Sequence, residues 1–285
     1  MMRKTLISIL FLVQILSTTY ANAQGYNIYS EPRDKQIFDN YISVMKGKER
    51  LEIDKIIVET AKFFLSVPYV AHTLEIEPEG LVINLRGMDC TTFVETVLAL
   101  SRTVKEGEPT FEKFCDNLRF IRYRDGKISG YHDRLHYTSD WMYENEKKGI
   151  IRRVIHTPEW EPLFLNLHIM SSNPGKYKQL SGDDSLKETV KNIEKDINTR
   201  DLFYLPHSKI QKNVSLFKSG DIVGFTTKID GLDVTHMGII YKEGNNLTFI
   251  HASLTHKKVI VNREPLHTYL SNTKGTGIIL SRAEN

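Results

Sequence analysis

The chain has 285 residues, of which 40% are hydrophobic and 26% are charged, and its formal net charge at pH 7 is +3. This composition excludes an intrinsically disordered chain, because it supplies enough apolar surface for a sizeable core in one large domain or two small ones. A charge this close to zero also argues against a nucleic-acid partner, since phosphate binding requires a concentrated positive charge.

The first 23 residues have the three-part layout of a secretory signal peptide. Arg3 and Lys4 precede an apolar run from Leu6 to Leu16, and the small-residue site Ala21-Asn22-Ala23 follows. The apolar run is shorter than the roughly 20 residues that a membrane-spanning helix needs, and no cysteine for lipid attachment follows it directly. We therefore expect an exported mature chain, residues 24–285, that is periplasmic or secreted and has no membrane anchor.

Helices are predicted first in the mature chain. Apolar spacing predicts two helices between residues 34 and 66, and the run 81–85 alternates like a short strand. A longer helix is predicted from Cys90 to about Val104, and Asp89 stands immediately before it, where a capping residue belongs. A cysteine therefore opens this helix.

The middle of the chain, about residues 106–215, is predicted to be an insertion of helices and loops within a single catalytic domain that spans residues 24–285. Its segment 111–121 places Cys115 on the apolar face of a helix, where cysteine behaves as a small core residue. A disulfide between Cys90 and Cys115 stays open as the alternative, because an exported chain reaches an oxidising compartment.

Strands dominate after Gly220. Alternation with period two predicts five of them, separated by turn residues, at 220–227, 233–241, 246–253, 257–262 and 275–282. Their short connections favour an antiparallel meander. The order, helices first and then strands, predicts an α+β fold in which the helix that begins at Cys90 packs on the sheet, with the helices on one side.

Three residues have the chemistry that nucleophilic catalysis needs. The start of a helix favours a thiolate at Cys90, because the helix dipole and the unpaired N–H groups stabilise negative charge. A catalytic thiol also needs an imidazole within hydrogen-bond reach and a third polar group that orients the ring. His236 and His251 lie on consecutive predicted strands, so a hairpin can set their rings side by side.

The chain resembles the NlpC-type cell-wall peptidases, which are papain-like cysteine enzymes, in five segments that follow the same order: VPYV, LRGMDCTTFVE, GDIVGF, THMGIIY and FIHAS. The longer stretches LRGMDCTTFVETVLALSRTV and RLHYTSDW are similar to one branch, the N-acetylmuramoyl-L-alanine amidase-like proteins. The resemblance implies a papain-like fold without a cofactor or metal, in which Cys90 is the nucleophile, His236 the general base and acid, and His251 the residue that orients His236.

The same resemblance implies that Tyr69, Asp89 and Thr91 contact the substrate, with Asp89 and Thr91 at the amine end of a stem peptide. Two alternatives stay open: Asp89 as a plain helix cap, and Tyr69 as a half-buried aromatic residue. The chain departs from the usual pattern, since Thr91 replaces a serine and residues 70–73 replace a glycine-rich stretch. These departures affect the predicted pocket and leave the three catalytic residues in place.

The segment YHDRLHYTSDW is predicted to line a substrate groove. There Arg134, His136, Asp140 and Trp141 offer charge, hydrogen bonds and a stacking face to a sugar or an acidic peptide. The first alternative is a structural polar cluster that ties the insertion to the core. The second is a metal site at His132 and His136 with an aspartate, which the spacing supports weakly because the zinc motif requires glutamate directly after the first histidine.

The leading interpretation is therefore hydrolysis of an amide bond in the peptidoglycan stem peptide. The bond is either the one between N-acetylmuramic acid and L-Ala or the one between D-Glu and the diamino acid. The expected partner is a stem peptide or muropeptide, and the expected state is a monomer. Two other classes remain: a catalytically silent module that binds the cell wall, and a secreted metal-dependent hydrolase.

Overall fold

The computed structural model describes residues 18–21, 25–107, 109–155, 158–244, 246–273 and 275–285. The expected signal peptide lies outside the described residues, apart from strand β1 (Thr18–Ala21), which pairs with β2 (Asn27–Ser30). Strand β2 pairs in parallel with β3 (Leu81–Val82). Within the described ranges, no helix combines the length and the apolar character needed to cross a bilayer.

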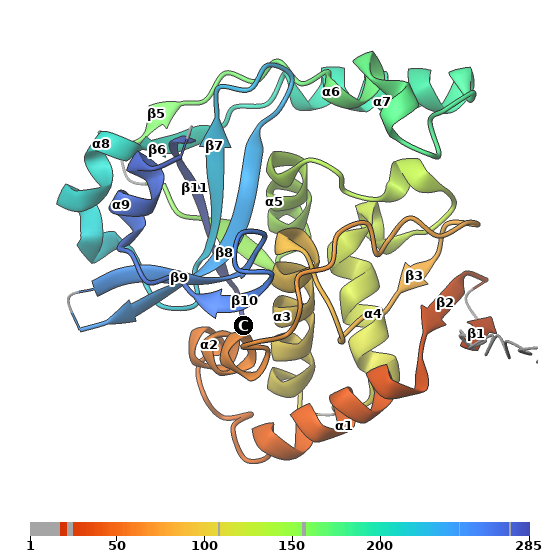
Figure 1. The fold of residues 1–285 in the computed structure, drawn as a ribbon, viewed down its shortest axis with the longest axis horizontal. Helices are drawn as coiled ribbons and strands as arrows, with labels where there is room; N and C mark the ends of the chain where they lie inside the picture. The colour runs from red at the N-terminus through yellow and green to blue at the C-terminus, as the bar shows by residue number, and fades with distance from the viewer. Residues whose placement is uncertain (1–17, 22–24, 108, 156–157, 245, 274) are drawn as a thin grey trace, which may run out of the picture.

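A larger, antiparallel sheet forms the centre of the protein (Figure 1). Its strand order among the described residues is β10-β9-β8-β7-β11-β6-β5, and β4 also pairs with β11. All five strands predicted after Gly220 are present. The strands of this sheet are β4 (Ile151–Arg153), β5 (Glu161–Pro162), β6 (Phe203–Pro206), β7 (Ile222–Thr227), β8 (Val234–Glu243), β9 (Asn246–Ser253), β10 (Lys258–Val261) and β11 (Gly275–Ala283).

The prediction of a plain meander was wrong for the last strand. β7 to β10 are neighbours in chain order, but β11 returns to the other side of β7 and lies between β7 and β6. Residues 277–281 of β11 are all buried, and a strand that is buried on both faces belongs in the centre of a sheet. The insertion also differs from the predicted helices and loops, because it contributes β4, β5 and β6.

Helices cover both faces of the sheet, so the prediction that they lie on one side was also wrong. Met237 and Ile239 of β8 belong to the hydrophobic core that contains α3, whereas Ile240 belongs to a second core with residues of α8 and α9. Successive strand residues point to opposite faces, which places these two cores on opposite sides of the sheet. The helices are α1 (Pro32–Met45), α2 (Ile53–Phe63), α3 (Cys90–Lys105), α4 (Phe111–Arg122), α5 (Thr138–Lys147), α6 (Ile169–Ser172), α7 (Asp184–Ile197), α8 (His207–Ile210) and α9 (Leu266–Ser271).

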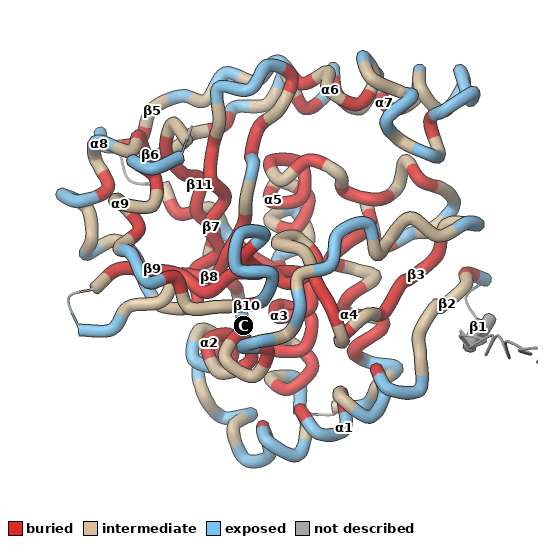
Figure 2. Tube along the Cα trace, viewed as in Figure 1, coloured by how far each residue is buried: buried red, intermediate tan, exposed pale blue. Residues whose placement is uncertain are grey.

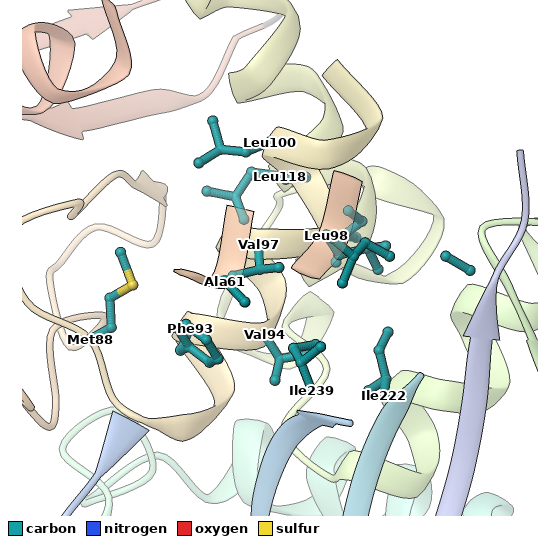
Figure 3. Packing of buried hydrophobic residues seen from close by; sticks show 14 of the residues in the cluster. Ala61, Met88, Phe93, Val94, Val97, Leu98, Leu100, Leu118, Ile222 and Ile239 are labelled. Atoms are coloured by element: carbon teal, nitrogen blue, oxygen red, sulfur yellow. The ribbon is translucent and has the colours of Figure 1, made fainter. Parts of the chain in front are cut away.

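Helix α3 is the central helix of the first core. Figure 2 shows it buried along most of its length, whereas α7 at the periphery is largely exposed or half-buried. Figure 3 shows Val94 of α3 beside Ile239 of β8, with Phe93 and Val97 on neighbouring turns. Burial of these apolar side chains fixes the start of α3 relative to β8, since the packed interior leaves little room for displacement.

Strands β8 and β9 separate at one end. Their pairing runs from Glu243 and Asn246 to Ile239 and Ile250, where it stops. Beyond that point β9 stays paired with β10 as far as Ser253, and β8 stays paired with β7 through a bulge next to His236. We call the diverging residues, 236–238 and 251–253, the β8–β9 fork.

Candidate active site

Cys90 is held at the start of α3 by a well-formed helix cap. The Asp89 side chain accepts a hydrogen bond from the Thr92 N–H at 2.8 Å, and the Thr92 hydroxyl accepts one from the Asp89 N–H at 2.9 Å. Cys90 is half-buried, and its sulfur accepts a hydrogen bond from the backbone N–H of Met237 in the β8–β9 fork. The cap and the core packing of α3 therefore place the sulfur against β8, one residue from His236.

The surroundings of Cys90 favour the neutral thiol. Burial, followed by the negative charge of Asp89, raises the pKa of the Cys90 thiol to about 11, although the N–H of Met237 and the neighbouring Thr91 act in the opposite direction. This is the reverse of the thiolate that the helix start led us to expect. Removal from water costs the thiolate more than the helix dipole and the hydrogen bonds from Met237 and Thr91 restore.

Both cysteines are free, so the disulfide alternative does not describe this structure. Cys115 lies in α4, 3% exposed, among core residues. Burial raises the pKa of the Cys115 thiol to about 12. It is a packed core residue, as its helical spacing indicated.

His236 and His251 form a hydrogen-bonded pair across the β8–β9 fork. The distance from His236 Nε2 to His251 Nδ1 is 2.6 Å, and the two ring planes are nearly perpendicular. Burial lowers the pKa of His236 to about 4 and the pKa of His251 to about 3, with the neighbouring His236 adding to the shift in His251. Both rings are therefore neutral near pH 7, and Nδ1 of His236 has no hydrogen-bond partner among the described residues.

Tyr69 and Thr91 lie next to Cys90, together with Asp89. Thr91 Oγ1 is 4.0 Å from the sulfur, and Tyr69 forms an isolated bridge with Met88 just before the cap. Burial, then the charges of Cys90 and Asp89, raises the pKa of Tyr69 to about 12. Asp89 is a helix cap, which does not exclude a second role, because Thr92 bonds to only one of its carboxylate oxygens.

The predicted substrate groove is largely interior. Asp140 is 1% exposed and is paired with Arg124 at 2.6 Å and Arg200 at 2.7 Å, and Trp141 is 1% exposed in the core. Arg134 is 5% exposed and pairs with Glu75 at 3.2 Å. Little of these three side chains is open to a substrate, and the pairing of Arg134 and Asp140 agrees with the alternative of a structural polar cluster.

His136 is half-buried, and its Nε2 lies 2.9 Å from the Tyr131 carbonyl oxygen. Burial lowers the pKa of His136 to about 3. His136 and Asp140 are engaged with different partners, and no group of three or more His, Cys, Asp or Glu side chains within the described ranges is arranged to hold a metal ion.

Sequence reasoning missed two parts of the site. The backbone N–H of Met237 carried no side-chain signal, although it lies next to His236. Tyr269 of α9 packs near both histidines, with ring centroids 6.3 Å from His236 and 6.1 Å from His251. Its segment contains no motif, and only the return of the chain over the sheet brings it here.

The family model described as AmiA-like, N-acetylmuramoyl-L-alanine amidase-like, matches residues 59–278. The chain belongs to this family. No protein with a curated description matches this AmiA-like chain. The matched range contains Cys90, the β8–β9 fork and Tyr269.

Solved structures agree with that assignment. An N-acetylmuramoyl-L-alanine amidase from Bacteroides uniformis is 42% identical, with a TM-score of 0.77 over 82% of this chain and 99% of its own. A putative xylanase from Bacteroides fragilis is 37% identical, with a TM-score of 0.74 over 79% of this chain and 99% of its own. A protein from Legionella pneumophila shares the fold at 20% identity, with a TM-score of 0.66 over 89% of this chain and 94% of its own. The AmiA-like chain is thus a mixed α+β protein with amidase-like relatives.

Proposed function

We propose that this AmiA-like protein is a papain-like, NlpC-type cysteine amidase that hydrolyses an amide bond in the peptidoglycan stem peptide. Cys90 is the nucleophile, His236 the general base and acid, and His251 the residue that orients His236. The observation that carries the proposal is the arrangement at the β8–β9 fork. There the His236–His251 bond of 2.6 Å lies one residue along β8 from the N–H that binds the Cys90 sulfur.

The hydrogen bond to His251 gives the two ring nitrogens of His236 different proposed roles. Because Nε2 faces His251, Nδ1 is the nitrogen left to exchange a proton with the thiol. A neutral His236 that carries its proton on Nε2 and donates it to His251 presents a bare Nδ1, which is the form a base requires. The low pKa values of both rings keep this neutral form populated throughout the physiological range.

The proposed reaction starts from a neutral Cys90 thiol and a neutral His236 ring. As the sulfur bonds to the carbonyl carbon, the thiol proton moves to His236, which then passes it to the nitrogen of the leaving amine as the C–N bond breaks. Water attacks the thioester, His236 takes its proton, and the same proton returns to sulfur when the acid is released. The backbone N–H of Cys90, at the first position of α3, is available to the oxyanion.

The amidase-like family supports a peptidoglycan substrate for this chain. Tyr69, Asp89 and Thr91 surround the sulfur and are proposed to contact the stem peptide. His136 is proposed to contact the substrate as well. The proposed setting is the periplasm or the exterior, reached through the signal peptide at residues 1–23. Residues 24–285 are proposed to act as one catalytic domain and as a monomer.

Mass spectrometry of purified muropeptides, incubated with residues 24–285, tests the proposal. Product masses identify whether the bond to L-Ala or the bond between D-Glu and the diamino acid is cut. The variants Cys90→Ala and Cys90→Ser should give no products while their circular dichroism stays unchanged, and Cys115→Ala serves as the matched control that retains activity. Undiminished hydrolysis by Cys90→Ala would refute the assignment.

The two other classes make different predictions in the same assay. A silent wall-binding module leaves all muropeptides intact even with the wild-type chain. A metal-dependent hydrolase loses activity when a chelator is added, whereas a cysteine amidase does not.

A further inference from the structure

Tyr269 lies over the imidazole pair on the side of the sheet opposite α3. Its ring centroid is 4.9 Å from Phe249 and 5.2 Å from Phe225, and both phenylalanine rings also contact His236. Phe249 and Phe225 are 0% and 2% exposed, whereas Tyr269 is half-buried. Tyr269 is therefore the member of this aromatic group that lies nearest to solvent, next to His236, which is also half-buried.

The aromatic group encloses His251 in particular. His251 is 3% exposed, and its Nε2 is buried without a hydrogen-bond partner among the described residues. The Phe249 ring centroid lies 4.6 Å from the His251 ring. A buried nitrogen without a hydrogen-bond partner shows that water does not reach the Nε2 side of His251. The surrounding packing must offset the free-energy cost of burying this polar atom.

Helix α9 holds Tyr269 firmly, although it is short. Leu266 and Leu270, on either side of Tyr269, are 0% and 1% exposed in the second core. His207 Nε2 lies 2.9 Å from the His267 carbonyl oxygen, which ties α8 to α9. These anchors fix the backbone of α9, and with it the Cα of Tyr269, relative to the histidines.

We propose that Tyr269 is a positioning residue that covers the His236–His251 pair, limiting the access of water to it and holding the His236 ring in its hydrogen bond with His251. This inference rests on the proposed function for its catalytic meaning. The ring of Tyr269, rather than its hydroxyl, performs this role, because the ring makes the contacts with Phe225, Phe249 and the two histidines. No described residue bonds to the hydroxyl.

The charges around the pair agree with a desolvation mechanism. The titratable groups near the site are Cys90 at the start of α3, Asp89 in its cap, Tyr69 from the segment before it, His256 from the turn after β9, and Tyr269 itself. Of these, His256 acts on the pair through its charge, which lowers the pKa of His251. Burial alone lowers the pKa of His236, so removal of a covering ring should raise it.

The test is a histidine titration by long-range ¹H–¹⁵N NMR on the free mature chain, with signals assigned from His236→Asn and His251→Asn. In Tyr269→Leu, the pKa values of His236 and His251 should rise by about one unit or more toward the ordinary value, because water reaches the rings. Tyr269→Phe keeps the ring and should titrate like the wild type. Thr268→Ala, on the same helix, controls for a general disturbance of α9.

Activity gives a second readout. The acid limb of kcat/KM for muropeptide hydrolysis should move to higher pH in Tyr269→Leu and stay in place in Tyr269→Phe, whereas a merely structural role would lower the melting temperature without moving the limb. Tyr269→Met replaces the leucine variant if that one fails to fold. An unshifted titration in a folded Leu or Met variant, or an equal shift in the Phe variant, would overturn the proposal.

The histidine titration does not depend on catalytic turnover, so the proposed function and the role of Tyr269 can be refuted independently. Hydrolysis that persists in Cys90→Ala refutes the proposed function, and an unshifted titration refutes the covering role of Tyr269.

Discussion

Gly238 allows the Phe249 ring to lie directly against β8. A Cβ atom at position 238 would be 2.9 Å from the Phe249 ring, 3.0 Å from the Ile250 carbonyl oxygen and 3.4 Å from the His251 Cβ. Real Cβ atoms do not approach a neighbour this closely without displacing it. The missing side chain therefore lets β9 bring His251 within hydrogen-bond distance of His236.

Gly238→Ala should push Phe249 and His251 away from β8 and lengthen the bond between the histidines. We expect kcat/KM for muropeptides to fall about 100-fold, as for a displacement of about 1 Å in a catalytic group, and overpacking to reduce the free energy of unfolding by about 1–3 kcal/mol. Steady-state kinetics and denaturant unfolding measure the two effects. Gly175→Ala is the matched control, because a Cβ there has nothing within 4 Å, and equal effects of both substitutions would contradict the prediction.

Alkylation of Cys90 should have the pH dependence of a thiol whose pKa is ordinary or raised. With a pKa raised to about 11, the thiolate fraction grows steadily as the pH rises, and the reaction rate with iodoacetamide should grow with it. The rate is measured from pH 5 to pH 10, and Cys90→Ser supplies the background from Cys115. A plateau already reached near pH 6 would show a preformed thiolate–imidazolium pair and contradict the neutral resting state.

Stability should decrease in mild acid because the folded chain holds three histidines in the neutral form. The pKa values of His136, His236 and His251 are lowered from 6.5 to about 3, 4 and 3. The unfolded chain therefore binds more protons than the folded chain below pH 6.5, so stability is fully present above that value and is lost as the pH falls toward 4. Denaturant unfolding at a series of pH values measures the slope, which should approach three protons.

His136→Gln should reduce that slope by about one proton. A free energy of unfolding that stays constant between pH 6.5 and pH 4 would contradict the neutral burial of these rings.

Asp140 should matter for stability and not for substrate binding. Asp140→Ala removes the closer of the two buried carboxylates that pair with Arg124 and Arg200 and leaves Glu144 as the other. Loss of these charged hydrogen bonds should cost about 1.5–3 kcal/mol. KM for muropeptides should stay unchanged. Asp196 also pairs with Arg200 but is 67% exposed, so Asp196→Ala should cost at most about 1 kcal/mol. A raised KM with normal stability in Asp140→Ala would restore the substrate-groove interpretation.

The elements that sequence reasoning predicted well are those with a local cause. The cap at Asp89 and the apolar spacing after it were sufficient to place α3, and alternation placed the five strands after Gly220. His236 and His251 were expected to lie side by side because consecutive antiparallel strands do so, and they do bond, although across the fork where the pairing of β8 and β9 has ended.

The features that were missed depend on contacts between distant segments. The place of β11 in the sheet depends on partners from the insertion, and the burial of Asp140 depends on Arg124 and Arg200, which lie 16 and 60 residues away. The pKa of Cys90 depends on how far the folded chain excludes water, which the helix dipole alone does not predict.

The position of β11 has a consequence for the order in which the protein can assemble. Residues 275–283 pair with β7 on one side and with β6 and β4 on the other, so they are the only link in the sheet between these groups of strands within the described residues. Until residues 275–283 are in place, the two halves of the sheet cannot join. Strands β4 and β6 therefore cannot join the rest of the sheet before β11 has folded.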